Sequence, residues 1–241
     1  MKIFAISDLH LSFGENIDKP MDKFGDGWEQ HTERLKTYWE ELVSDEDIVL
    51  IPGDISWGLR LEEALADFDW LHSLPGIKIL SKGNHDLWWS RINYLNSLYE
   101  DIIFLQNDCY EPSCGGVVIT ASRGWPYPGS DEYTEHDAKI YAREIQRLRL
   151  GLDAAVRKAP EARIIVCLHY PPSDPSGRIT GFTEVLEEYH VWKCIYGHLH
   201  GPVAFGRGIK GEVRDIEYRL VSLDYLGAKP KLIYDSDNPE S

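Results

Sequence analysis

The chain has 241 residues, of which 43% are hydrophobic and 27% are charged, and its formal net charge is −15. This composition is ordinary for a globular protein, and the length suits one large α/β domain as well as two small ones. An acidic surface without a basic stripe argues against a protein that wraps long nucleic acid. A small anionic substrate remains open, because bound cations dominate the local field of a site.

The sequence shows no clear pattern of a signal peptide, a membrane segment or a disulfide framework. The apolar stretch at residues 1–7 is too short for a signal peptide, and no apolar run approaches membrane-spanning length. The four cysteines show neither metal-site spacing nor the density of a disulfide framework. We interpret Cys167 and Cys194 as buried thiols and expect no disulfide between Cys109 and Cys114. These features lead us to expect a cytoplasmic protein without a membrane segment.

Hydrophobic periodicity predicts strands that alternate with helices along the first 200 residues. In chain order we expect a strand at 2–7, a helix at 26–44, a strand at 47–51, a helix at 61–74, a strand at 77–80, a helix at 88–99, strands at 102–105 and 117–120, a helix from 134 to about 156, a strand at 164–168, a helix at 182–189 and a strand at 191–196. Asp26 and Glu29 resemble a capping box, and Thr134 opens a helix-start signature.

The region after His200 indicates an antiparallel arrangement, with a strand at 203–205, a glycine-rich turn and a strand at 213–223. The tail from about Lys229 is polar, and we expect it to be loose. One domain over residues 1–229 and a polar tail at 230–241 are therefore predicted. Strands that alternate with helices imply an α/β fold with a sheet covered on both faces, and the later hairpins make the sheet mixed.

Five short motifs follow predicted strands in a fixed order. They are Asp8-Leu9-His10, Gly53-Asp54, Gly83-Asn84-His85-Asp86, His169 and Gly197-His198-Leu199-His200. In open α/β sheets, ligands bind beyond the carboxyl ends of the strands, so these side chains should converge. Residues i and i+2 of an extended backbone point the same way, so one D-x-H pair can aim both side chains at one cation.

The converging donors indicate a transition-metal site. The predicted metal ligands are Asp8, His10, Asp54, Asn84, His169, His198 and His200. Carboxylate, imidazole and amide groups together suit Zn, Mn, Fe or Co better than Mg or Ca. The absence of cysteine argues against a structural zinc site. Two metals ~3.5–4 Å apart can clamp an in-line displacement at phosphorus and lower the pKa of a bridging water toward ~7.

In this order the motifs resemble the calcineurin-like metallophosphoesterase superfamily over roughly residues 8–200. The resemblance implies two mixed β-sheets packed as a sandwich and flanked by helices. It also implies a dinuclear-metal-dependent hydrolase that cleaves a phosphomonoester or phosphodiester by attack of a metal-bridging hydroxide. The nearest similar chains are small bacterial-type predicted phosphohydrolases, and the resemblance supplies no substrate for them.

The resemblance also assigns roles to individual residues. One metal would be bound by Asp8, His10 and His200, and the other by Asn84, His169 and His198. Asp54 would bridge the two metals. His85 would face the substrate, stabilise charge on the phosphoryl group and protonate the leaving oxygen. Asp86 would hydrogen-bond to His85 and fix its orientation.

One departure from the family pattern concerns the phosphate clamp. Relatives among the protein phosphatases continue G-D into a loop that ends in Arg-Gly, whereas Gly58 occupies the arginine position here. This argues against a protein phosphatase and leaves Arg60 and Arg123 as candidate clamps. Trp88 and Trp125 are candidate substrate contacts. The loops at 123–129 and 13–24 are predicted pocket walls.

Two alternatives to the hydrolase stay open. The first is a catalytically silent protein-binding scaffold on the same fold, since a fold does not fix an activity. The second is a nuclease, against which the net charge of −15 argues. The expected partner is a small phosphate-ester substrate, and the oligomeric state is left open.

Overall fold

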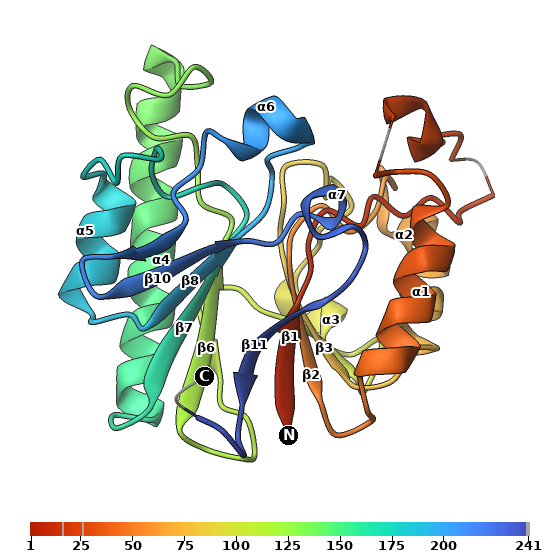
Figure 1. Cartoon of the computed structure of the whole chain (residues 1–241), viewed down its shortest axis with the longest axis horizontal. Helices are drawn as coiled ribbons and strands as arrows, with labels where there is room; N and C mark the ends of the chain where they lie inside the picture. Colours follow the sequence, from red (N-terminus) through yellow and green to blue (C-terminus); the bar gives the residue numbers. More distant parts are fainter. Residues whose placement is uncertain (16, 26, 240–241) are drawn as a thin grey trace.

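Two β-sheets face each other at the centre of the molecule, and helices cover their outer faces (Figure 1). The structure is a computed structural model of the chain, and it describes residues 1–15, 17–25 and 27–239. The first sheet has the strand order β11-β1-β2-β3-β4, and the second has the order β5-β6-β7-β8-β10-β9. Two mixed sheets with flanking helices confirm the predicted sandwich.

The first sheet is parallel except at one edge. Its parallel strands are β1 (Lys2–Ala5), β2 (Ile48–Pro52), β3 (Ile77–Ser81) and β4 (Ile102–Phe104). The edge strand β11 (Lys231–Asp235) runs antiparallel to β1. The helices beside this sheet are α1 (His31–Leu42), α2 (Leu61–His72) and the short α3 (Ile92–Leu95) (Figure 1).

The second sheet has a parallel centre and two antiparallel edges. Its central strands are β6 (Val117–Ser122), β7 (Arg163–Leu168), β8 (Lys193–Tyr196) and β10 (Ile216–Leu220). The edge strands are β5 (Cys109–Tyr110) and β9 (Gly211–Val213). Its outer face is covered by α4 (Ala138–Lys158) and α5 (Gly181–Glu188) (Figure 1).

Four shorter elements complete the described chain. They are the 3-10 helices η1 (Met21–Phe24) and η2 (Glu135–Asp137) and the helices α6 (Gly201–Phe205) and α7 (Leu223–Leu226). The segments containing η1, α6 and α7 lie at the same end of the molecule (Figure 1). This is the end at which the parallel strands terminate, so these short elements surround the predicted site.

The core has three apolar layers, as β2 illustrates. Ile48 and Leu50 belong to the cluster between the sheets, whereas Val49 and Ile51 belong to the cluster under α1 and α2. Successive strand residues point to opposite faces, so a strand buried on both sides reads as a continuous apolar run. A third cluster lies between the second sheet and the helices α4 and α5. The central strands are thus packed on both faces, and the polar motifs of the predicted site follow their carboxyl ends.

Two predictions about the last forty residues were wrong. Residues 203–205 belong to helix α6 rather than to a strand, and Pro202 lies in its first turn, where proline is well tolerated. The tail predicted to be loose contains β11, whose Ile233 and Tyr234 are buried against the sheets. The folded domain therefore extends beyond residue 229. Its edge strand was hidden because the buried residues are flanked by lysine and aspartate.

Several element boundaries also differ from the predictions. The helix predicted at 26–44 covers only His31–Leu42, and the one predicted at 88–99 shortens to Ile92–Leu95. The segment predicted as one strand at 213–223 ends β9, forms β10 and enters α7. The capping box of Thr134 with Asp137 is formed, whereas Asp26 lies outside the described residues.

The cysteines follow the prediction. Cys109, Cys114, Cys167 and Cys194 are all free thiols, and Cys167 and Cys194 are buried. In the part of the chain that the structure describes, no helix combines the length and apolar character needed to cross a bilayer.

Candidate metal centre

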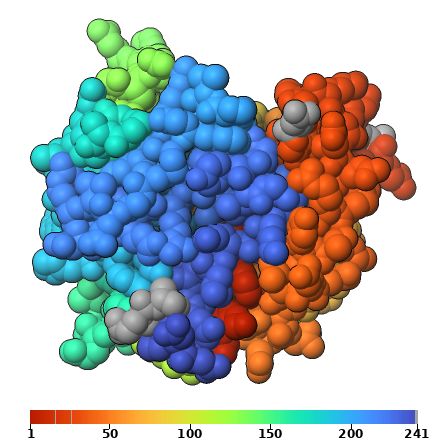
Figure 2. Space-filling model, in the orientation of Figure 1, coloured from red at the N-terminus to blue at the C-terminus, as the bar shows by residue number. Residues whose placement is uncertain are grey.

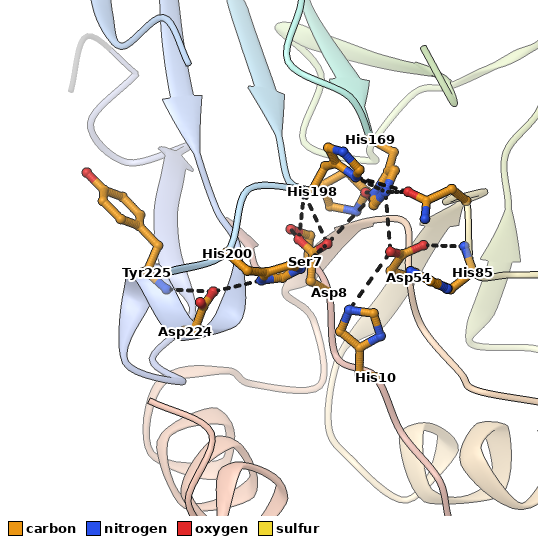
Figure 3. A network of polar contacts seen from close by, with 12 residues as sticks. Ser7, Asp8, His10, Asp54, His85, His169, His198, His200, Asp224 and Tyr225 are labelled. Carbon is orange, nitrogen blue, oxygen red and sulfur yellow. Dashed lines mark hydrogen bonds and ion pairs between the residues drawn. The ribbon is translucent and has the colours of Figure 1, made fainter. Parts of the chain in front are cut away.

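All seven predicted metal ligands meet where β1, β2, β3, β7 and β8 end, and Figure 3 shows six of them under their labels. The backbone there is unusual. Asp8, His10, Asp54 and His198 have φ values of 58°, 47°, 53° and 71°. Left-handed backbone costs a non-glycine residue roughly 1–2 kcal/mol, and such residues cluster at functional sites. The strand ends therefore turn sharply in order to direct these side chains inward.

A first group of donors consists of Asp8, His10 and His200, whose ligand atoms all lie within 4.8 Å of one another. Nε2 of His200 lies 3.3 Å from Oδ1 of Asp8. His10 is held between aromatic side chains, since its ring stacks on Trp57 at a centroid distance of 4.7 Å. This group matches the three ligands that the resemblance implies for one metal.

A second group consists of Asn84, His169 and His198. Oδ1 of Asn84 lies 2.7 Å from Nε2 of His169 and 3.0 Å from Nδ1 of His198. The two ring nitrogens are 3.3 Å apart. Three donor atoms this close together, from three separate strand ends, match the set that the resemblance implies for the second metal.

Asp54 lies between the two groups. Its Oδ2 is 3.4 Å from Nε2 of His169 and 3.9 Å from Nε2 of His10. Its Oδ1 accepts a hydrogen bond of 2.8 Å from the backbone N–H of His85. One carboxylate oxygen is therefore fixed by the backbone and the other faces both groups, as a bridging ligand requires.

Carboxylates and carbonyls behind the imidazoles fix the ring orientations. Asp224 pairs with Nδ1 of His200 at 3.0 Å, and Glu132 pairs with Nε2 of His198 at 3.1 Å. Nδ1 of His169 bonds to the carbonyl oxygen of Pro52 at 3.1 Å. Such outer partners hold the opposite ring nitrogen toward a metal. Asp224 and Glu132 were not predicted from the sequence, because neither stands at a spacing from its histidine that a sequence pattern could have shown.

The carboxylates in the site favour the ionised form. Burial alone would raise the pKa of Asp8, but His200 and the other nearby histidines hold it well below its ordinary value. Burial also opposes ionisation of Asp54, yet the adjacent His169 lowers its pKa to about 2. Both groups are therefore anionic at neutral pH, which is the form that binds metals.

The histidines divide into two kinds. Burial would lower the pKa of His169 and His200, but the carboxylates of Asp54 and Asp8 raise these pKa values to about 9 and about 10. Burial dominates for His10 and lowers its pKa to about 4. In the protein alone, the protons on His169 and His200 thus balance the two carboxylates, and bound cations would replace these protons.

The donor set fits divalent transition metals. It combines two buried carboxylates and an amide oxygen with four imidazoles, the mixture that suits Zn, Mn, Fe or Co. His10 is neutral and buried, and its Nδ1 has no hydrogen-bond partner. The other ring nitrogen, Nε2, lies 3.9 Å from Oδ2 of Asp54 and is therefore the nitrogen that faces the other donors.

Asp86 has a different role from the predicted one. Its carboxylate accepts the backbone N–H groups of Asp54, Ile55 and Gly83 at 2.7–2.9 Å, and that of Ser56 at 3.4 Å. Among the described residues it makes no hydrogen bond to the His85 ring, so the predicted contact was wrong. Burial and the neighbouring Asp54 raise the pKa of Asp86 to about 7, although these N–H groups favour its ionised form. Asp86 joins the loops after β2 and β3, which carry Asp54 and Asn84.

Position 53 has room only for glycine, because the His169 ring and the backbone of Gly83 lie close to it. Its φ is +92°, and an added Cβ would lie 2.6 Å from Nδ1 of His169. A side chain here would strain the backbone and displace the ring that Pro52 orients.

His85 lies on the exposed side of the site, where its ring packs on Trp57 at a centroid distance of 4.5 Å. Burial lowers the pKa of His85 below its ordinary value.

Two cavities flank the donors. One has a volume of about 310 Å³ and lies beside His198, with Tyr127, Tyr170 and Arg207 in its wall. The other has a volume of about 610 Å³ and lies beside His10, His85 and His200. Residues of the loops at 123–129 and 13–24 line one cavity each, so the structure places both loops as pocket walls, as predicted.

The four predicted substrate contacts lie elsewhere. Trp88 is 2% exposed and packs on Phe68 in the core, so the prediction of a pocket contact was wrong. Arg123 pairs with the buried Glu144 at 3.4 Å and stacks on Trp125 at 4.3 Å. Arg60 is exposed at the start of α2. None of these four residues belongs to the described lining of either cavity.

The protein belongs to the calcineurin-like phosphoesterase family, because the family model of that description matches residues 1–202 of the chain. This match covers every donor of the site and confirms the resemblance carried by the five motifs.

Two phage proteins match part of the chain. The chain is 31% identical over 109 residues to the Gene 66 protein of Mycobacterium phage D29, an alignment that covers 39% of this chain and 52% of that protein. It is 35% identical over 80 residues to the Gene 66 protein of Mycobacterium phage L5, with 33% and 37% covered. The chain thus spans about half the length of the first relative and just over a third of the second.

Solved structures share the fold over nearly the whole chain. The phosphopantetheinyl hydrolase PptH of Mycobacterium tuberculosis has a TM-score of 0.59 at 14% identity, covering 100% of this chain and 98% of that one. The protein of unknown function AQ665 of Aquifex aeolicus has a TM-score of 0.51 at 19% identity, with 96% and 95% covered. TT1561 of Thermus thermophilus has a TM-score of 0.52 at 10% identity, with 85% of each chain covered. At these identities the likeness shows the fold alone.

Proposed function

We propose that this protein hydrolyses a small phosphomonoester or phosphodiester with the help of two divalent transition-metal ions. The observation that carries the proposal is the position of Asp54, whose Oδ2 lies 3.4 Å from His169 and 3.9 Å from His10, between the two donor groups. The ions would be held by Asp8, His10 and His200 on one side and by Asn84, His169 and His198 on the other, with Asp54 shared. Manganese, iron, zinc and cobalt all suit these donors.

Bound there, two cations would supply Lewis acidity that neutralises phosphoryl oxygens and lowers the pKa of water toward ~7. The protein contributes the rigid frame. Asp86 fixes the two loops, while Asp224 and Glu132 orient His200 and His198. We assign His85 to the substrate, since its exposed ring lines the larger cavity beside the shared Asp54. In this role it protonates the leaving oxygen.

The related proteins support the reaction class. Family membership favours metal-dependent cleavage of a phosphoester, and the structural relative PptH is named a hydrolase. The acidic chain and the absence of Lys and Arg from the described lining of the larger cavity disfavour a nucleic-acid polymer. A silent scaffold is disfavoured because the chain retains all seven donors and His85.

The proposal is tested by loading purified protein with Mn and measuring metal content and hydrolysis together. We expect about two equivalents of metal, as a shared carboxylate implies, and turnover of nitrophenyl esters. His85→Ala should slow alkyl esters, which have poor leaving groups, by about 10²–10⁴-fold, and nitrophenyl esters far less.

Other outcomes separate the alternatives. Background metal after loading would contradict the dinuclear site. Two bound metals without hydrolysis of either ester class would favour the scaffold. Strong cleavage of single-stranded DNA that falls steeply with salt would favour the nuclease. If His85→Ala slows the hydrolysis of alkyl and nitrophenyl esters equally, His85 is not the proton donor.

A further inference from the structure

The larger cavity has an unusual lining for a protein that handles phosphate. Its apolar wall consists of Met21, Phe24, Trp28, Trp57 and Pro202. Among the described residues that line it, Asp224 supplies a carboxylate, and the basic side chains are His10, His85 and His200, with neither lysine nor arginine. The ammonium of Lys19 lies 5.5 Å from the Trp57 ring centroid, outside that lining. A further phosphate placed here would meet the carboxylate of Asp224 and no basic lining side chain beyond these histidines, of which the proposed function assigns two to a metal and His85 to the leaving oxygen.

The wall is also held in place. Trp57 stacks on His10, and its Nε1 donates a hydrogen bond to Sδ of Met21 at 3.3 Å. Trp28 is 3% exposed and packs on both His10 and His200. Phe24 is different, because 69% of it is exposed at the mouth of the cavity. Rigid indole rings at the base and a free phenyl ring at the mouth suit a flat apolar guest.

His85 connects this cavity to the reaction. It lines the larger cavity and is absent from the described lining of the smaller one. A side chain that protonates a leaving oxygen must come within hydrogen-bond reach of it. The leaving group therefore lies on the His85 side of the donors, between the N-terminal segment and α6. In Figure 2 the red and orange surface of the N-terminal region lies next to the blue surface of the C-terminal region, and residues of both regions line the larger cavity.

We propose that the larger cavity binds the leaving group of the phosphate ester, and that this group is flat, apolar and free of additional negative charge. The assignment rests on the proposed function, because His85 defines the leaving-group side. It makes Phe24 and Trp57 specificity-determining residues. The preferred substrate is then an ester of an aromatic alcohol rather than of an alcohol that carries further phosphates.

The test compares two phosphate esters whose leaving alcohols have the same pKa, one a phenol and the other a small fluoroalkyl alcohol. The wild-type protein should prefer the aryl ester in kcat/KM. Phe24→Ala should reduce that preference about tenfold, mainly through KM of the aryl ester, as expected for loss of one aromatic contact. Leu150→Ala provides the matched control, because it removes a side chain that is 53% exposed on α4, on the outer face of the second sheet, and that is outside the described lining of the cavity.

A second measurement does not depend on turnover. 1-Naphthol added to the protein without metal should quench tryptophan fluorescence in a saturable way, and Phe24→Ala should weaken its binding by a similar factor. Saturable quenching without hydrolysis of either ester would contradict the proposed function, and with it the leaving-group role, and would leave the cavity as a binding site for aromatic molecules. An active enzyme with equal preference in wild type and Phe24→Ala would overturn the cavity assignment alone. A wild-type preference for a leaving alcohol bearing extra phosphate would overturn it as well.

Discussion

At the scale of single residues, Asp86 is the side chain on which the two metal-carrying loops depend. Asp86→Asn replaces one carboxylate oxygen by an NH₂ group, which leaves two of the four backbone N–H groups without an acceptor. Each orphaned buried donor costs about 1–3 kcal/mol, and relief of repulsion with Asp54 offsets a part. We expect the free energy of unfolding of the protein without metal to fall by about 2–4 kcal/mol, measured by urea denaturation.

A surface carboxylate provides the control. Asp174 also accepts backbone N–H groups, from Ser176 and Arg178, but it lies in a half-exposed turn, so Asp174→Asn should cost under about 1 kcal/mol. Unchanged stability in Asp86→Asn, together with a loss of rate confined to poor leaving groups, would instead support the contact with His85 that the sequence suggested.

The two aspartates of the site should differ in their effect on metal binding. Asp54→Asn should weaken both metals, because Oδ2 of Asp54 faces both donor groups. Asp8→Asn should weaken mainly the metal at His10 and His200. Asp8 does approach His169 at 4.0 Å, but there it faces Nδ1, the nitrogen bonded to Pro52. Elemental analysis and calorimetric titration with Mn would measure both stoichiometries. Identical stoichiometry and affinity in the two variants would contradict the shared role of Asp54.

At the scale of elements, helix α2 is tied to the loops of the site through Asp67. This buried carboxylate accepts the backbone N–H of Phe13 at 2.7 Å and the hydroxyl of Ser56. Burial raises its pKa to about 6, although both hydrogen bonds favour the ionised form. The fold therefore binds a proton more tightly than the unfolded chain does. Asp67 then destabilises the fold increasingly as pH rises from about 4 to 6, by a total of about 3 kcal/mol.

Asp67→Asn keeps one acceptor and removes the charge. Relative to wild type, its free energy of unfolding should rise with pH between about 4 and 7 and then level off. Urea denaturation of both proteins at pH 4 and pH 7 measures this difference. Glu62→Gln makes the same charge change on an exposed position of α2 and serves as the control. A difference between Asp67→Asn and wild type that stays flat across this range would show that burial does not perturb Asp67.

The elements also show what the sequence could and could not predict. Strands buried on both faces, such as β2 and β7, form continuous apolar runs, and the polar motifs directly after them located all seven donors. Short elements at the rim were harder. Residues 203–205 favour a strand by composition, but Pro202 and the packing of α6 beside α7 decide for a helix. Asp224 and Glu132 meet their histidines only through the tertiary fold, so no local pattern marks them.

At the scale of the whole molecule, the last strand completes the sheet that carries the first motif. β11 pairs with β1, and β1 leads directly to Asp8 and His10. Ile233 and Tyr234 are 1% and 4% exposed in the layer between the sheets. Removing this strand would expose that layer and leave β1 as an unpaired edge, which is prone to aggregation.

A chain that ends at Lys229 should therefore unfold at a much lower urea concentration than the full chain. The buried isoleucine and tyrosine alone account for roughly 4 kcal/mol or more of unfolding free energy, by analogy with large-to-small core substitutions. A chain that ends at Ser236 keeps β11 and should behave nearly like the full protein. Equal stability of the chains ending at 229 and 236 would mean that the final segment is dispensable. It would then follow that β1 holds the first metal motif without an antiparallel neighbour, which the burial of Ile233 and Tyr234 argues against.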